Sequence, residues 1–109
     1  ESDGGTSVTQ NIVQGLGKIW VNYDGTASDA SARDSFGVSG QADNGTGDYT
    51  TSFTNNMNND DYASGFGTNS AEAEIHTLAT SSIRASMLNS SGSNNDKSIV
   101  SYIILGDLA

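Results

Sequence analysis

The longest apolar run of the sequence lies near its end, in residues 97–107. Successive side chains of a β-strand point to opposite faces, so the run divides into two alternating sets. One set is Ile99, Ser101, Ile103 and Leu105, and the other is Val100, Tyr102 and Ile104. Because both sets are apolar, the pattern predicts a strand that is covered on both sides, by a sandwich interior or by a neighbouring subunit. The run is too short to cross a bilayer as a helix.

Shorter alternating segments precede this run, and turn residues separate them. The clearest is residues 18–23, where Ile19, Val21 and Tyr23 share one face and Trp20 lies on the other. Further strands are predicted at residues 35–39, 49–54, 61–67 and 83–89. Residues 41–48 contain Asn44-Gly45 and Gly47, which tolerate positive φ, so this segment is predicted to be a hairpin loop.

Residues 69–80 allow two interpretations. Asn69 followed by Glu72 resembles a helix capping box, and the apolar residues behind them fit a helical stripe. Strand alternation also fits from Glu74 to Leu78. We favour the strand, because the segments on either side are β.

Seven or eight short strands joined by turns predict an all-β fold, namely an antiparallel, jelly-roll-like β-sandwich. Residues 1–17 are predicted to be a lead-in strand or linker, and residues 18–109 the sandwich domain. The sequence begins with Glu1 rather than Met and shows no signal peptide, which predicts a piece of a longer protein.

Composition adds a difficulty for a monomer. Leu, Ile, Val and Phe together number 20 of 109 residues, and the net charge is -9. Chains this poor in large apolar residues rarely complete a core alone, and the absence of cysteine excludes disulfides. Oligomerisation is then the expected solution. Four Lys and Arg residues against 13 Asp and Glu residues argue against nucleic acid and anionic membranes as partners.

No set of residues marks a catalytic site. His76 is the only histidine, so a Ser-His-Asp arrangement would have to use it, and a lone histidine is more often an ordinary strand residue. Asp60-Asp61 or Asp43 with Asp48 could ligate calcium, but their spacing matches no calcium loop. Turn chemistry explains Asp43 and Asp48 better, and the sequence predicts no catalytic residue, no metal site and no cofactor.

Trp20 and Arg84 each allow two readings. Trp20 could stack on a sugar, but burial in the core or between subunits is the more common role of such a residue. Arg84 either pairs with a carboxylate at an interface or sits on a rim, and the sequence does not decide between these.

Several segments resemble a C-terminal domain of tailed-phage fibre proteins of the marine and cyanobacterial phage type. The matching segments are residues 14–26, 33–39, 43–50, 53–54, 57, 82–84, 89–92 and 100–106. The most specific are Trp20-Val21-Asn22 with the aromatic residue after it, and the Asp-Asn-Gly-Thr-Gly-Asp-Tyr hairpin. The chain departs from this family at Asn58, where the family usually has Pro.

The resemblance implies a virion location, in a tail fibre or other surface appendage, and attachment to a host cell-surface glycan or protein. It also implies a homotrimer joined to the rest of the fibre, without membrane insertion. One sandwich has one interior, so the second apolar faces are expected to pack on neighbours, and Trp20, Tyr102 and Ile104 are the predicted subunit-interface residues. No receptor-binding residue is assigned. The alternatives are a structural virion part, such as a head decoration or fibre-capping domain, and a polysaccharide-degrading tailspike.

Overall fold

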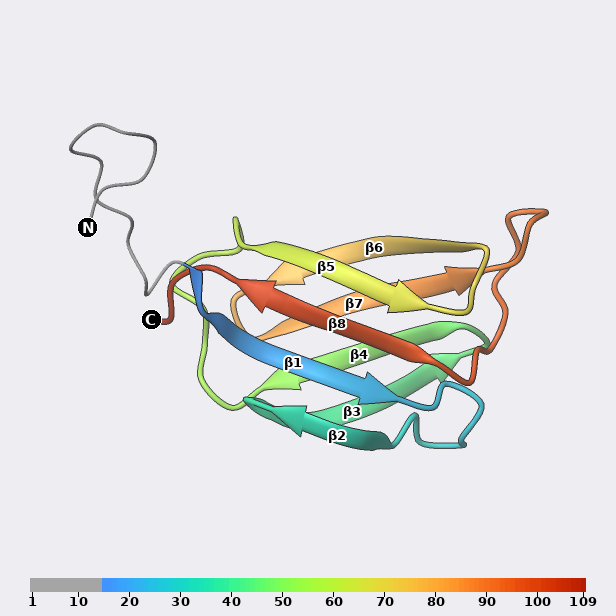
Figure 1. Ribbon diagram of the computed structural model, residues 1–109, viewed down its shortest axis with the longest axis horizontal. Coiled ribbons are helices and arrows are strands. Elements are labelled where there is room, and N and C mark those ends of the chain that lie inside the picture. The colour runs from blue at the N-terminus through green and yellow to red at the C-terminus, as the bar shows by residue number, and fades with distance from the viewer. Residues whose placement is uncertain (1–14) are drawn as a thin grey trace, which may run out of the picture.

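The computed structural model describes residues 15–109 as two four-stranded antiparallel sheets packed face to face (Figure 1). One sheet has the strand order β2-β1-β8-β5, and the other has the order β3-β4-β7-β6. The strands are β1 Gly17–Tyr23, β2 Ala32–Phe36, β3 Val38–Gly45, β4 Asp48–Phe53, β5 Ala63–Thr68, β6 Glu72–Ala79, β7 Ser82–Leu88 and β8 Val100–Leu105. The predicted antiparallel β-sandwich is therefore confirmed.

The core lies between the two sheets and is built by the alternation that the sequence shows. The inward side chains of the four central strands are almost completely buried: Ile19, Val21, Tyr23, Tyr49, Thr51, Phe53, Ile83, Ala85, Met87, Val100, Tyr102 and Ile104. Tyr23 packs edge-on against Tyr49 and Tyr102, with ring centroids 5.3 and 6.0 Å apart. Such aromatic pairs add stability beyond the apolar area that they bury.

Hydroxyl groups connect the two sheets inside this core. The hydroxyls of Thr51 on β4 and Tyr102 on β8 are hydrogen-bonded to each other, and both residues are buried. The Tyr49 hydroxyl donates to the Gly25 carbonyl at 2.9 Å and lies 3.0 Å from a carboxylate oxygen of Asp96. Burial raises the pKa of Tyr49 and of Tyr102, because the ionised phenolate loses its hydration.

The chain crosses between the sheets at Gly37, which corrects one predicted strand. Residues 35–39 do not form a single strand, because Phe36 ends β2 in one sheet and Val38 begins β3 in the other. Gly37 has a φ of 74°, and a Cβ there would lie 2.9 Å from the Lys18 carbonyl oxygen. Only glycine fits this turn without strain.

The hairpin between β3 and β4 is present but tighter than predicted. Residues 41–45, which were predicted to be loop, belong to β3, and the turn consists of Thr46 and Gly47. Gly47 has a φ of 64° and is buried beneath the backbone of Asn95 and Met87. The favoured strand in residues 69–80 is confirmed as β6. The predicted lead-in segment falls largely on residues 1–14, which lie outside the described residues.

Candidate functional site

The outer face of the β2-β1-β8-β5 sheet, meaning the surface turned away from the other sheet, is unusually apolar. Backbone register places Phe36 opposite Trp20, Trp20 opposite Ile103, and Ile103 opposite Gly65. These four residues form one row across the sheet, which we call the cross-strand row. Phe36 is 59% exposed, Trp20 38% and Ile103 43%. Large apolar side chains in such a contiguous arrangement typically mark an interaction surface.

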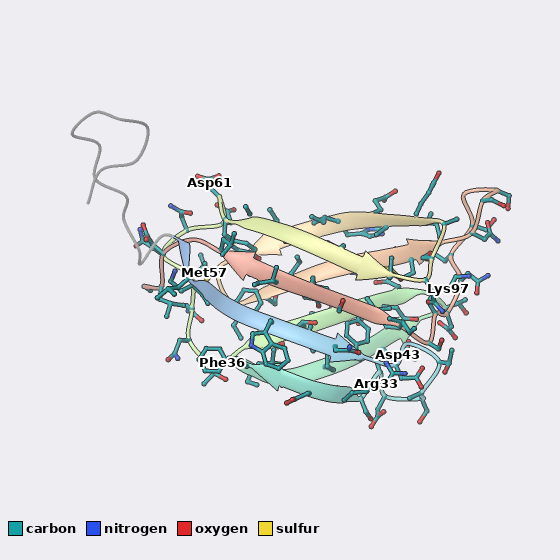
Figure 2. The ribbon with its side chains drawn as sticks, in the orientation of Figure 1. Arg33, Phe36, Asp43, Met57, Asp61 and Lys97 are labelled. Atoms are coloured by element: carbon teal, nitrogen blue, oxygen red, sulfur yellow. The ribbon has the colours of Figure 1, made fainter. Side chains whose placement is uncertain are left out.

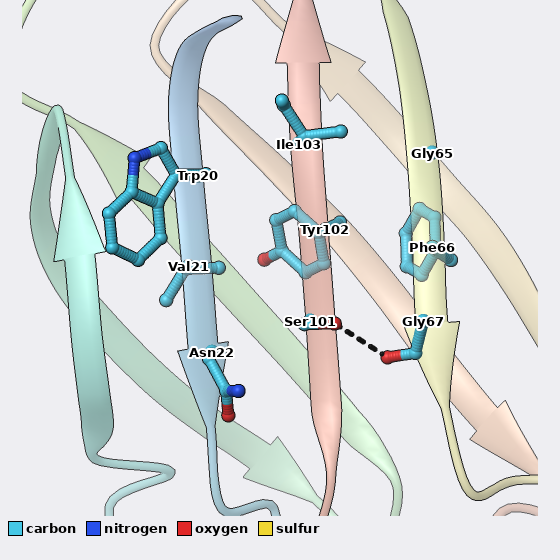
Figure 3. A pocket seen from close by; sticks show the side chains of 9 residues that line it. All are labelled: Trp20, Val21, Asn22, Gly65, Phe66, Gly67, Ser101, Tyr102 and Ile103. Carbon is cyan, nitrogen blue, oxygen red and sulfur yellow. Dashed lines mark hydrogen bonds between the residues drawn. The ribbon is translucent and has the colours of Figure 1, made fainter.

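A shallow groove of about 490 Å³ runs along this face beside β5 (Figure 3). We call it the glycine groove, since Gly65 and Gly67 leave its β5 side without side chains, while Trp20, Asn22, Ser101 and Ile103 supply the rest of the exposed lining. The Ser101 hydroxyl donates to the Gly67 carbonyl at 3.0 Å, as the dashed line in Figure 3 shows. The groove is therefore apolar along most of its length and has few free polar groups.

The apolar surface continues toward the end of the molecule where β1 begins and β8 ends. Leu16, Leu105 and Leu108 are each more than a third exposed there. A second hollow of about 260 Å³ lies beside Phe36, between Lys18 and Leu108. Phe36 is thus flanked by concave surface at the edge of the sheet, and it is the most exposed of the large apolar residues that the structure describes.

Two of the three predicted interface residues are misplaced. Tyr102 is 4% exposed and Ile104 is fully buried, and both lie in the interior of a single chain. The sandwich uses the Val100, Tyr102 and Ile104 set of β8 as its core, and turns the Ile103 set outward. Trp20 does lie on the outer face, opposite the buried set of β1, as the alternation predicted.

The outer face of the β3-β4-β7-β6 sheet is polar instead. Arg84 on β7 donates to both carboxylate oxygens of Asp48 on β4, from Nε at 2.9 Å and from Nη2 at 2.6 Å. These hydrogen bonds hold the pKa of the Asp48 carboxyl below its usual range. The Asn44 amide nitrogen lies 3.3 Å from the same carboxylate. Arg84 therefore pairs with a carboxylate of its own chain, whereas the first of its two readings placed that carboxylate at an interface.

His76 lies on the same face but does not form a catalytic arrangement. Its Nε2 is 2.7 Å from the Ser86 hydroxyl and 3.7 Å from a carboxylate oxygen of Glu74. A Ser-His-acid triad needs the acid on the other ring nitrogen, so that the imidazole is oriented for proton transfer. Ser86 is also fully buried, which leaves no access for a substrate.

The loops at the end opposite Gly17 are held by short side-chain turns. The Asp24 carboxylate accepts the Thr26 N–H at 2.9 Å, the Asp43 carboxylate accepts the Gly45 N–H at 2.9 Å, and Asn89 accepts the Ser91 N–H at 3.0 Å. Figure 2 shows Asp43 and Lys97 at this end and Met57 at the other. Asp43 thus has the turn role that its sequence suggested.

Within residues 15–109, no group of three or more acidic, histidine or cysteine side chains is placed to hold a metal ion. In the same part of the chain, no helix has the length and apolar character needed to cross a membrane. In comparisons with protein-family models, with curated proteins and with solved structures, nothing matched this chain.

Sequence reasoning missed three residues of this candidate site: Phe36, Ile103 and Gly65. Phe36 and Val38 are two residues apart in the predicted strand 35–39, which would place them on one face, and Tyr102 rather than Ile103 is predicted at the interface. The spacing of Gly65 and Gly67 was the available signal for the groove. Two glycines separated by one residue leave a single face of a strand bare.

Proposed function

We propose that this chain is a homotrimeric attachment domain of a virion fibre, and that its copies assemble through the outer face of the β2-β1-β8-β5 sheet. The three large side chains of the cross-strand row, Phe36, Trp20 and Ile103, carry this proposal. Burial of these side chains against neighbouring copies supplies the apolar area that a chain with 20 large aliphatic or phenylalanine residues lacks on its own.

The distribution of charge supports the same face. Each chain has a net charge of -9, so copies repel one another unless they meet where acidic residues are scarce. The outer face carries Lys18 and Arg33, and Arg33 lies 3.2 Å from the amide oxygen of its neighbour Asn22. The acidic residue of β2 on this face is Asp34, which lies opposite Asn22. The remaining repulsion is screened by salt, so association is expected to tighten as ionic strength rises.

Attachment is assigned to the loop end of the sandwich, which projects away from the beginning of β1 and the C-terminal residues (Figure 1). Asn, Ser and Thr side chains are abundant there, and a host glycan or surface protein is the expected ligand. The second candidate is a purely structural virion part. It is favoured by the loop carboxylates and amides that are already engaged in turns of their own, as at Asp24 and Asn89.

Sedimentation equilibrium at physiological salt tests assembly. The wild-type chain is expected to have the mass of three copies. Ile103→Ser should weaken association by about 1 kcal/mol per subunit, because roughly half of a buried isoleucine contribution remains to be gained at the interface. Ile75→Ser is the matched control, since Ile75 is 42% exposed but lies on β6 in the other sheet. Equal weakening by the two substitutions contradicts the assigned face.

A glycan array separates attachment from a structural role. The trimer should bind at least one host-surface glycan, and the dissociated Ile103→Ser chain should bind it more weakly, because single sites lose avidity. A trimer that binds no capsular or lipopolysaccharide glycan and no host cells supports the structural alternative.

A further inference from the structure

We propose that Phe36 of each copy inserts into the glycine groove of the next copy around the three-fold axis. The inference rests on the proposed trimer and identifies the contact that closes it. The occupant is a second copy of this chain, and the contact is head-to-tail, because one edge of the sheet supplies the side chain and the opposite edge supplies the groove.

Backbone register aligns the two halves of the contact. Phe36, Trp20, Ile103 and Gly65 lie opposite one another on successive strands, so Phe36 on the β2 edge and Gly65 on the β5 edge are at the same height along the strands. Rotation about an axis parallel to the strands preserves height. Phe36 of one copy therefore arrives beside Gly65 of its neighbour, and the direction of β2 is antiparallel to that of β5, as in a continued antiparallel sheet.

The dimensions of the sheet fit three copies. Strands lie about 4.8 Å apart, so a four-stranded sheet is about 19 Å wide, and a triangle with sides of that width has an inscribed radius of about 5.5 Å. Packed sheets lie about 10 Å apart, which leaves about 5 Å for the side chains of each sheet. Three outer faces turned toward one axis would therefore enclose a space that their own side chains fill.

Side-chain size matches the corners of this triangle. Where two sheets meet at a sharp angle, bulky side chains on both would collide, so one of the two edges must be small. The exposed set of β5 consists of Ala63, Gly65 and Gly67, whereas the β2 edge presents Phe36. The groove of about 490 Å³ next to the glycines gives the aromatic ring a place to pack.

Charge does not oppose this contact. The residues that line the groove are all uncharged, so the phenylalanine enters without placing two acidic surfaces together. Contact through an uncharged surface limits the repulsion between chains that each carry a net charge of -9.

Disulfide trapping tests the contact directly, since the natural sequence contains no cysteine. Within one chain, positions 36 and 65 are three strand spacings apart, about 14 Å, which is beyond the reach of a disulfide. The double variant Phe36→Cys/Gly65→Cys can therefore cross-link only between copies. After complete oxidation with diamide, which accepts the two electrons of each thiol pair, non-reducing electrophoresis should show a covalent trimer. A covalent dimer as the end product, or monomer alone, overturns the proposal.

A second variant avoids dependence on oxidation. A Cβ at Gly65 meets only the Ile103 side chain at 3.7 Å, so Gly65→Leu is compatible with the folded chain and fills the groove. It should weaken trimer formation about tenfold or more in sedimentation equilibrium while the circular dichroism spectrum is retained. Gly40→Leu is the matched control, because Gly40 also faces open space but lies on β3 of the other sheet. A Gly65→Leu chain that assembles like wild type contradicts the contact.

The experiments distinguish a failure of the groove contact from a failure of the trimer. If the wild-type chain is trimeric but the double variant does not cross-link, the proposed groove contact is wrong and the proposed trimer is retained. If the wild-type chain is monomeric at micromolar concentration, both fall.

Discussion

The hydrogen bond between Thr51 and Tyr102 predicts a non-additive pair of substitutions. Tyr102→Phe removes one hydroxyl and leaves that of Thr51, which is fully buried, without its partner. An unsatisfied buried polar group costs about 1–3 kcal/mol. For a chain of this length, each kcal/mol corresponds to a decrease in Tm of roughly 4 °C. Thr51→Val should cost less, because the Tyr102 hydroxyl keeps the Tyr23 side chain as a second hydrogen-bond partner.

The double variant Tyr102→Phe/Thr51→Val removes both hydroxyls together and leaves an apolar contact of nearly the same shape. Its loss of stability should therefore be smaller than the sum of the single losses by about 1 kcal/mol or more. Urea unfolding followed by far-UV circular dichroism, at one fixed protein concentration, measures all four chains. Additive losses would refute the bond. Tyr102→Phe should also leave the association constant of the folded chains unchanged, because the side chain lies inside one copy.

Three further predictions follow from particular contacts. The pKa of Asp48 is lower in the folded chain than in the unfolded chain, so the ionised carboxylate stabilises the fold above the unfolded-state pKa, and this stability is lost as pH falls through the folded-state pKa. Asp48→Asn should therefore lower the free energy of unfolding at pH 7 by about 1 kcal/mol and flatten the acid unfolding curve below about pH 4. Burial raises the pKa of Tyr62 to about 12. The neutral phenol therefore contributes to stability below the unfolded-state pKa near 10, and this contribution is lost as pH rises toward 12. A titration monitored by tyrosinate absorbance should show cooperative alkaline unfolding. Gly47→Ala should lower the Tm by more than Gly45→Ala does. A Cβ at Gly47 would lie 2.6 Å from backbone atoms, whereas the space around Gly45 is open. Equal decreases in Tm would contradict the packing under the hairpin.

Alternation predicted the central strands because their inward residues are large and their sequence period is strict. In β1 and β4, every second residue is buried, and in β1 the buried set is Ile19, Val21 and Tyr23, which the sequence groups on one face. The edge strands were predicted less well. Most of β3 consists of small and polar residues, which resemble a loop when burial is unknown.

The sequence alone could not predict which face of β8 points into the core. Both faces of that strand are apolar, so periodicity cannot tell which one the sandwich covers. Tyr102 is predicted at a subunit interface, yet its hydroxyl is hydrogen-bonded to the buried Thr51 across the core. A hydroxyl pair between residues so distant in the chain has no local sequence signal.

The cross-strand row could not be predicted from the sequence for a related reason. Its members come from four strands, and their alignment depends on the pairing register, which a single sequence does not provide. The turn at Gly37 also separates Phe36 from Val38, so neighbours in the sequence face different surroundings.

Sedimentation equilibrium of the wild-type chain, at micromolar concentration and physiological salt, tests the central claim most directly. We predict a single species with three times the mass of 11.2 kDa, and tighter association as salt is raised. A folded monomer whose mass does not change with concentration or salt would contradict it.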